Sequence, residues 1–183
     1  MPGPSAFTDP RSYHVLTYGT LLGSQIFQSF VNGIVAYRSL PRPQFATLQT
    51  ALFPIYFSMQ TALPVVLALT YPGASTLRGM VTSGLGGVLD ESNRWNVLLP
   101  LVVMAGTSVA NLVAVGPATT RIMRERKHQE TRDGKKSYDP APHSKEMEQL
   151  NQRFGIMHGV SSLLNMAGLL ATMWYGVVLA ERL

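Results

Sequence analysis

Four long stretches of this 183-residue chain contain no Asp, Glu, Lys or Arg, and they constrain its fold more than any other feature. They cover residues 12–37, 43–77, 95–120 and 154–180. Each can supply the roughly 20 apolar residues that a helix needs to cross a hydrocarbon layer about 30 Å thick. The pattern predicts an all-α integral membrane protein in which four transmembrane helices form an antiparallel bundle.

The expected spans lie at about 14–37, 45–69, 95–115 and 155–180. They belong to one membrane domain, 14–183, that follows a polar N-terminal tail, 1–13. Pro54 and Pro64 lie inside the second span, where each removes a backbone donor and favours a kink.

Two connections carry their own predictions. A short amphipathic helix is expected in the membrane interface over 74–91, because apolar residues recur there at helical spacing. A polar cytosolic loop over 117–153 is expected between the third and fourth spans. We expect a helical extension at its beginning and a helix start at KEMEQLNQRF near its end.

A short basic turn, RSLPRP at 38–43, separates the first two uncharged stretches. Arg38 and Arg42 must mark a membrane surface, because guanidinium groups cannot lie unpartnered in hydrocarbon. With four spans, eleven Lys and Arg residues fall on the side of this turn and four on the side of the chain ends. The positive-inside rule then predicts a cytosolic turn and non-cytosolic termini.

Polar side chains without formal charge lie within the expected spans and predict an intramembrane polar face. The residues are Gln25, Gln28, Asn32, Gln49, Gln60, Asn111, His158, Ser161, Ser162 and Asn165. In a bilayer such a face should point into the bundle, where its members hydrogen-bond between helices. The alternative is that they line a path or site for a ligand.

Small residues at a spacing of four predict close contacts between helix backbones in lipid. Three such pairs occur: Gly19 with Gly23, Ser29 with Gly33, and Gly155 with Gly159.

The uncharged stretches also exclude several chemistries. They contain no carboxylate or lysine, which argues against a proton- or sodium-coupled transporter. Every Asp lies outside them, so no Ser-His-Asp set can be assembled. The chain has no Cys, which excludes thiolate metal sites and iron–sulfur clusters. No aromatic-basic platform accompanies the net charge of +5, so no nucleic-acid partner is expected. We expect neither enzymatic activity nor a cofactor.

Two histidines, His14 and His158, nevertheless suggest a haem or copper alternative. Topology argues against one shared site, because the first begins its span on the outer side and the second on the cytosolic side. Antiparallel spans would separate them by roughly 20–30 Å. Single ligation together with a methionine such as Met157 stays open, as does a plain hydrogen bond at a helix end.

Several motifs carry a family resemblance over nearly the whole chain. FVNGIVAYRSLPRPQFATLQTALFPIYF, ANLVAVGPATTRIMRER and LNQRFGIMHGVSSLLN resemble the transmembrane protein 205-like family of four-helix membrane proteins. The connection around 71–93 and the loop at 128–144 do not match visibly. Because the family is described by a domain of unknown function, the resemblance implies a fold and a membrane location but little chemistry.

The preferred function is therefore a structural, assembly or accessory subunit that packs against other membrane proteins. The expected partners are the lipid bilayer and a larger membrane protein or a second copy of the chain. The alternative is a carrier or binding bundle for a small molecule or metal that uses the intramembrane polar face, and a haem- or copper-binding redox protein is the third. With no cleavable targeting signal in view, the endoplasmic reticulum or another endomembrane is the expected location, ahead of a mitochondrial membrane.

Overall fold

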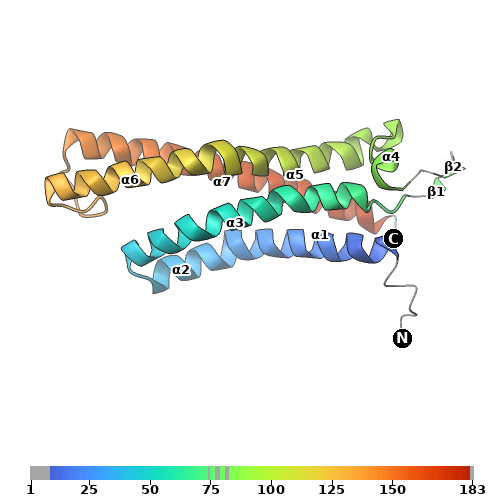
Figure 1. Cartoon of the computed structure of the whole chain (residues 1–183), viewed down its shortest axis with the longest axis horizontal. Coiled ribbons are helices and arrows are strands. Elements are labelled where there is room, and N and C mark those ends of the chain that lie inside the picture. The colour runs from blue at the N-terminus through green and yellow to red at the C-terminus, as the bar shows by residue number, and fades with distance from the viewer. Residues whose placement is uncertain (1–8, 74, 77–78, 81–82, 182–183) are drawn as a thin grey trace.

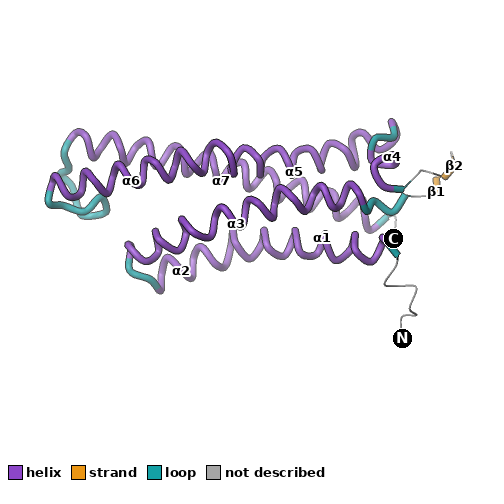
Figure 2. Tube along the Cα trace, viewed as in Figure 1, coloured by secondary structure: helices purple, strands orange, loops and turns teal. Residues whose placement is uncertain are grey.

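The computed structural model describes residues 9–73, 75–76, 79–80 and 83–181, and almost all of them are helical (Figures 1 and 2). Four long helical segments run antiparallel. The first contains α1 (Pro10–Ile26), the π-helical η2 (Phe27–Asn32) and α2 (Gly33–Ser39), and the second is α3 (Arg42–Leu69). The third contains η3 (Glu91–Asn93), η4 (Arg94–Leu98), α5 (Leu99–Ala110), η5 (Asn111–Val115) and α6 (Gly116–Asp133), and the fourth is α7 (Lys145–Ala180). The predicted all-α fold is confirmed.

The four segments close into a ring. α1 packs on α3 and α7, and α5 packs on the same two helices from the other side. Both ends of the described chain lie at one end of the bundle with α4 (Gly84–Val88), and the α2–α3 turn lies toward the other (Figure 1). α6 and the start of α7 form a hairpin that extends beyond this turn (Figure 1). We call the end with this hairpin the hairpin end, and the end with both chain ends and α4 the terminal end.

Among the described helices, three are long and apolar enough to cross a membrane: α3, the continuous helix Glu91–Asp133, and α7. The first segment is comparable in length, but Gln25, Gln28 and Asn32 make it less apolar. Its outward surface is still apolar, with Phe27 and Ile34 among the exposed side chains.

The helix boundaries correct several expectations. α1 begins at Pro10 rather than at residue 14, because Asp9 Oδ1 accepts a hydrogen bond from Arg11 N and caps it. Within the stretch 117–153, the expected helical extension reaches Asp133 and the expected helix start lies at Lys145, so the connection is only 134–144. α6 ends at Asp133 and is capped by Gly134, whose φ of 62° is a left-handed conformation that glycine adopts without strain.

The connection over 74–91 also differs from the expected amphipathic helix. A two-residue strand β1 (Ser75–Thr76) pairs with β2 (Gly79–Met80), and only the five residues of α4 are α-helical. The glycines in GLGG disfavour a longer helix. Leu77 and Val81, which supported the amphipathic pattern, lie outside the described residues.

Prolines act differently in the second and third helices. α3 continues through Pro54 and Pro64 without interruption. In the third helix the π-helical segments η4 and η5 come directly before α5 and α6, whose first turns contain Pro100 and Pro117. A proline ring clashes with the carbonyl group four residues earlier, and widening the preceding turn relieves that clash.

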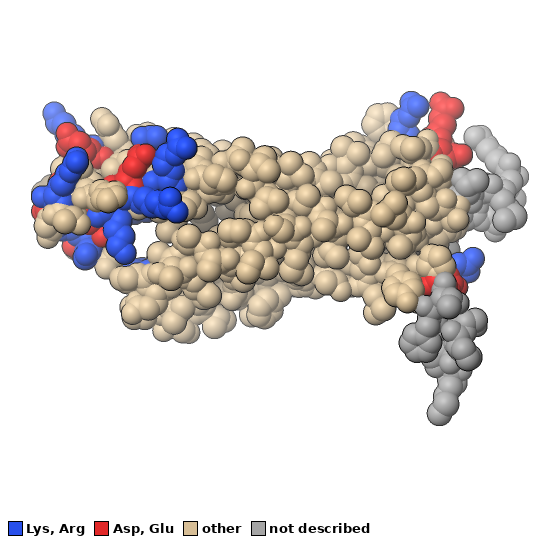
Figure 3. Space-filling model, in the orientation of Figure 1, with Lys and Arg blue, Asp and Glu red and all other residues tan. Residues whose placement is uncertain are grey.

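The apolar core lies toward the terminal end. Its buried residues come from all four long helices, α4 and the connection after α3, which contributes Tyr71: Leu21, Leu67, Tyr71, Val88, Val97, Leu101, Met104, Tyr175, Val178 and Leu179. Toward the hairpin end, α2 and the start of α3 diverge from α6 and α7 (Figures 1 and 3). The molecule is thus closed at one end and splayed at the other.

Candidate functional site

The middle of the bundle holds a chain of polar contacts between three helices. Tyr56 OH of α3 donates to Asn165 Oδ1 of α7 at 2.8 Å. Asn165 Nδ2 in turn donates to Ser29 Oγ of η2 at 2.9 Å. Because hydrocarbon offers no competing partners, such bonds fix the relative positions of the helices.

Other members of the predicted polar face also find partners. Gln60 Nε2 donates to Ser24 Oγ at 2.9 Å, which joins α3 to α1. Asn111 Nδ2 donates to the backbone oxygen of Ser161 at 3.3 Å, which joins η5 to α7. Asn32 Nδ2 bonds to Gln28 Oε1 within the first segment. Much of this face is therefore used between or along the helices.

Within the expected spans, four buried amide oxygens have no hydrogen-bond partner in the described structure: Gln25 Oε1, Gln49 Oε1, Gln60 Oε1 and Asn111 Oδ1. All four side chains are buried, Gln25 to 3% and Gln60 to 1% exposure. Oxygens of this kind accept hydrogen bonds, so a group that donates, such as water, a hydroxyl or an ammonium, would satisfy them.

His158 and Ser162 do not point into the bundle, which corrects their assignment to the inward face. Both are exposed, and the His158 ring stacks on Phe154 with an interplanar angle of 2°. The inward stripe of α7 instead passes through Ser161 and Asn165. His158 lies toward the hairpin end, where the helix pairs diverge and leave this side of α7 uncovered.

His14 occupies a closed polar cluster at the terminal end. Its side chain is fully buried, with Nδ1 3.0 Å from Thr70 Oγ1 and Nε2 2.8 Å from the Tyr175 hydroxyl. Because both ring nitrogens are engaged by protein groups, binding a metal or haem iron would require one of these bonds to break. No group of three or more His, Asp or Glu suited to a metal occurs among the described residues.

The five glycines of the expected small-residue pairs make no close contact with another helix among the described residues. A Cβ placed on Gly19, Gly23, Gly155 or Gly159 would meet nothing within 4 Å, and one on Gly33 would meet only its own helix. These glycines lie on outward sides of the helices or in the splayed region, so the neighbouring helices do not reach them.

A different small-residue stripe makes the close contacts in α7. A Cβ on Gly168 would lie 3.0 Å from Thr107 Oγ1, and one on Gly176 would overlap the Tyr18 hydroxyl. Gly168, the buried Thr172 and Gly176 recur every four residues, which is the signal that could have identified them.

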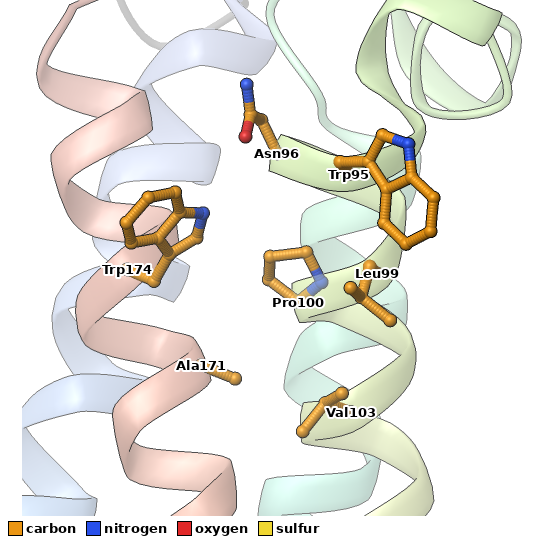
Figure 4. Close-up of a pocket in the computed structure, with 7 residues that line it drawn as sticks. All are labelled: Trp95, Asn96, Leu99, Pro100, Val103, Ala171 and Trp174. Atoms are coloured by element: carbon orange, nitrogen blue, oxygen red, sulfur yellow. The ribbon is translucent and has the colours of Figure 1, made fainter.

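An open cleft of about 350 Å³ lies at the side of the bundle near the terminal end (Figure 4). Trp95 stands on one wall and Trp174 on the other, with Leu99, Pro100, Val103 and Ala171 as the floor and sides (Figure 4). Asn96 supplies the polar group at its mouth. Both indoles are more than half exposed, as expected of tryptophans at a membrane interface.

The hairpin is held together by polar contacts outside the expected spans. Glu125 pairs with Arg153 at 3.7 Å, and Lys136 with Glu130 at 3.7 Å. Partial burial alone would raise the pKa of Glu130. Hydrogen bonds from the Ser137 backbone and hydroxyl, together with nearby cations, outweigh burial and hold that pKa below its ordinary value.

Comparison with known proteins places these features in a family. A family model described as a domain of unknown function, DUF4149, matches residues 16–128. The chain belongs to this family. No solved structure matches it.

The match to one relative covers more of the chain than the family model does. This relative is the xanthocillin biosynthesis cluster protein D of Aspergillus fumigatus, 34% identical over 171 residues, which are 93% of this chain and 89% of the relative. The DUF4149 match runs from α1 into α6 and contains the basic turn with Arg38 and Arg42. The contacts of α7, including those of Asn165, lie beyond it.

Proposed function

We propose that this chain is a non-enzymatic accessory protein of the transmembrane protein 205-like type that assembles with larger membrane proteins. The observation that carries the proposal is the α6–α7 hairpin, which projects beyond the α2–α3 turn (Figure 1). Ile122 and Met147 are buried in this part of the molecule, and Glu125 pairs with Arg153. A charged projection with its own internal contacts suits recognition of another protein, because charged groups supply orientation and specificity.

The interior of the bundle supports the same role. Two sets of hydrogen bonds join the helices, as expected of groups that fix a bundle. One set links Tyr56, Asn165 and Ser29, and the other links Gln60 to Ser24. The Aspergillus relative is named for a biosynthesis cluster, which supports a partner that takes part in biosynthesis at a membrane. We place the hairpin in the cytosol and both termini in the lumen of an endomembrane, with a mitochondrial membrane as the alternative.

The experiment is to purify the tagged full chain from its native membrane in mild detergent and determine the size and composition of the particle. We expect a defined complex larger than the bare chain, with chemical cross-links from the hairpin lysines Lys135, Lys136 and Lys145 to one partner. Lys127→Glu with Arg132→Glu should dissociate it, whereas Arg94→Glu at the terminal end should not. A particle that contains one copy of this chain alone would contradict the proposal.

The same sample distinguishes the accessory role from a homo-oligomer and from a redox protein. A particle that contains two copies and nothing else would identify a homo-oligomer. A Soret band or stoichiometric copper that is lost in His158→Ala would replace the accessory role with a redox role.

A second candidate function, a carrier for a small apolar molecule, is favoured by the cleft between Trp95 and Trp174. Its volume of about 350 Å³ falls within the range of ligand pockets, roughly 300–1,000 Å³. These are the only two tryptophans of the chain, so its indole fluorescence reports directly on the cleft. A brominated ligand that enters should quench the emission, and Ala171→Phe should block the quenching. Leu163→Phe, at an exposed site elsewhere on α7, is the control.

A further inference from the structure

The charges of this molecule are strongly segregated. Lys and Arg crowd the hairpin end, while the visible middle of the bundle shows neither basic nor acidic side chains (Figure 3). Four arginines stand where the charged end begins: Arg38 in the last turn of α2, Arg42 at the start of α3, and Arg121 and Arg124 in α6. We call these four residues the arginine collar.

The collar has no acidic counterpart within the described residues, where none of its members forms an ion pair or a side-chain hydrogen bond. The nearby carboxylates are occupied elsewhere. Glu125 pairs with Arg153, and Glu130 pairs with Lys136. Asp133 accepts hydrogen bonds from Gln129 and Ser144. The collar therefore presents positive charge that the rest of the hairpin does not neutralise.

Arg42 is held in a geometry that suits an oxyanion. Its guanidinium lies 3.6 Å from the centroid of the Tyr37 ring, which fixes the plane of the group. Nη1 is shielded from solvent and has no hydrogen-bond acceptor in the described structure. A planar guanidinium binds phosphate in a bidentate manner through two of its N–H groups. In Arg42, which is only partly buried, these are the groups other than the shielded Nη1.

The position of the collar selects the source of that phosphate. The exposed apolar side chains of Ile34 and Val35 lie within two helical turns of Arg38, and the exposed Tyr37 is typical of a membrane interface. The third expected span ends at residue 115, directly before Gly116. Arg121 lies only five residues, or about 7.5 Å, beyond Gly116 along α6. Phosphates at this level, next to apolar helix surfaces, are those of phospholipid headgroups.

We propose that the arginine collar binds the phosphate groups of anionic phospholipids in the leaflet at the hairpin end. Acyl chains would lie against the apolar sides of α2 and α3, while guanidinium groups from both helix pairs hold the headgroup. An acidic protein segment could meet the charge but not the adjoining apolar surface, which favours a lipid. This binding would also bridge the two pairs of helices where they diverge.

The experiment uses the full chain in nanodiscs of phosphatidylcholine with or without phosphatidylserine, followed by native mass spectrometry of the lipids that remain bound. We expect preferential retention of phosphatidylserine. Arg38→Gln with Arg42→Gln, or Arg121→Gln with Arg124→Gln, should each lower that retention by about thirtyfold. Arg132→Gln with Lys145→Gln removes the same charge from the far part of the hairpin and should leave retention unchanged. Equal losses in this control and in the collar variants would show diffuse attraction and overturn the proposal.

Two further arms make the result specific. Arg42→Lys keeps the charge but loses the bidentate fork, so it should lower retention of phosphatidylserine, and full retention would contradict the assigned geometry. Excess inorganic phosphate should not displace the lipid; displacement would identify a free-phosphate site instead of a headgroup site. Thermal unfolding of every variant shows whether it is folded, and Arg42→Lys keeps the test valid if a double variant is not.

Discussion

At Gly176 the absence of a side chain leaves room on α7 for the Tyr18 ring of α1. A Cβ there would overlap the Tyr18 hydroxyl and lie 2.6 Å from Cζ of the same ring. The Tyr18 ring also packs 6.2 Å from the Tyr175 ring, which limits its freedom to move. We expect Gly176→Ala to lower the free energy of unfolding by about 1–2 kcal/mol, because overpacking outweighs the helix propensity that alanine adds.

Thermal unfolding in mild detergent measures this change. Gly155→Ala is the matched control on the same helix, since a Cβ there meets nothing within 4 Å. We expect the control to be neutral or slightly stabilising. Equal effects at the two sites would show that the close approach to Tyr18 does not limit packing.

The bond between Tyr56 and Asn165 gives a second prediction at this scale. Tyr56→Phe and Asn165→Leu each remove one partner of a 2.8 Å hydrogen bond between α3 and α7. We expect a double-mutant cycle to give a coupling energy of about 0.6 kcal/mol and at most roughly 1.7 kcal/mol, as found for bonds between membrane helices. The pair Tyr56→Phe and Ser162→Ala is the control, and coupling there of the same size would rule out a specific bond.

Individual residues show how far the sequence could predict the site. Asn165, Gln60 and Gln25 were expected to face inward, and the structure places them there, since an amide exposed to hydrocarbon is costly. His158 lies seven residues before Asn165, at the spacing of one helix face, but it is exposed. Spacing alone gives the direction of a side chain around its helix. It does not show whether a neighbouring helix is present at that height.

At the scale of elements, the N-terminal cap of α7 fixes the start of the hairpin's second helix. Ser144 Oγ accepts from Met147 N at 3.2 Å and donates to Asp133 Oδ2 of α6 at 2.7 Å. We expect Ser144→Ala to destabilise this end of α7 by about 1 kcal/mol. Hydrogen exchange of the amides in the first turn of α7 would then be faster, whereas Thr131→Ala should leave it unchanged. Unchanged exchange in Ser144→Ala would contradict a capping role.

The connection between α6 and α7 should also respond to pH through Glu130. The pKa of this carboxyl is held below its ordinary value because hydrogen bonds from Ser137 and the charges of Lys136 and Arg126 outweigh its partial burial. A lowered folded-state pKa contributes stability that is complete above the unfolded-state pKa and is lost as the pH falls through the folded-state pKa. We expect proteolysis within 134–144 to accelerate as the pH falls below about 4.5, the ordinary value.

An acid-active protease provides the measurement, and Glu130→Gln provides the control. The variant should already be cleaved faster at neutral pH and should show a smaller change as the pH falls. If the wild type and the variant respond to acid equally, Glu130 does not govern the connection.

Elements were predicted more reliably in kind than in extent. Runs without charge identified the long helices, because only an apolar helix satisfies its backbone in hydrocarbon. In the charged stretch 117–153 the sequence indicated helix at both ends but not how far each helix extends, although α6 and α7 bury Ile122 and Met147 there. The extent of these two helices depends on contacts between segments that are distant in the sequence, which local patterns do not encode.

At the scale of the whole molecule, the number of membrane crossings decides which surfaces face lipid and which face water. Three helices have the length and composition of a span. The first segment, Pro10 to Ser39, runs beside them in the ring but is less apolar. Its buried Gln25 faces the other helices, and its outward Phe27 and Phe30 are apolar. We therefore expect it to cross the bilayer as the fourth span, because Gln25 is buried and the half-buried Gln28 and Asn32 bond to each other.

Single cysteines test this directly, since the natural chain has none. Arg11→Cys, Tyr138→Cys and Glu181→Cys lie at exposed positions beyond the expected spans. With four spans, a membrane-impermeant maleimide added to sealed vesicles should label positions 11 and 181 from the same side and position 138 from the opposite side. With three spans, position 11 would instead be labelled together with position 138, because the first segment would lie along one face of the membrane. That result would place Gln28 and Asn32 at a membrane surface. The bonds from Asn165 to Ser29 and from Gln60 to Ser24 would then not lie among four spanning helices.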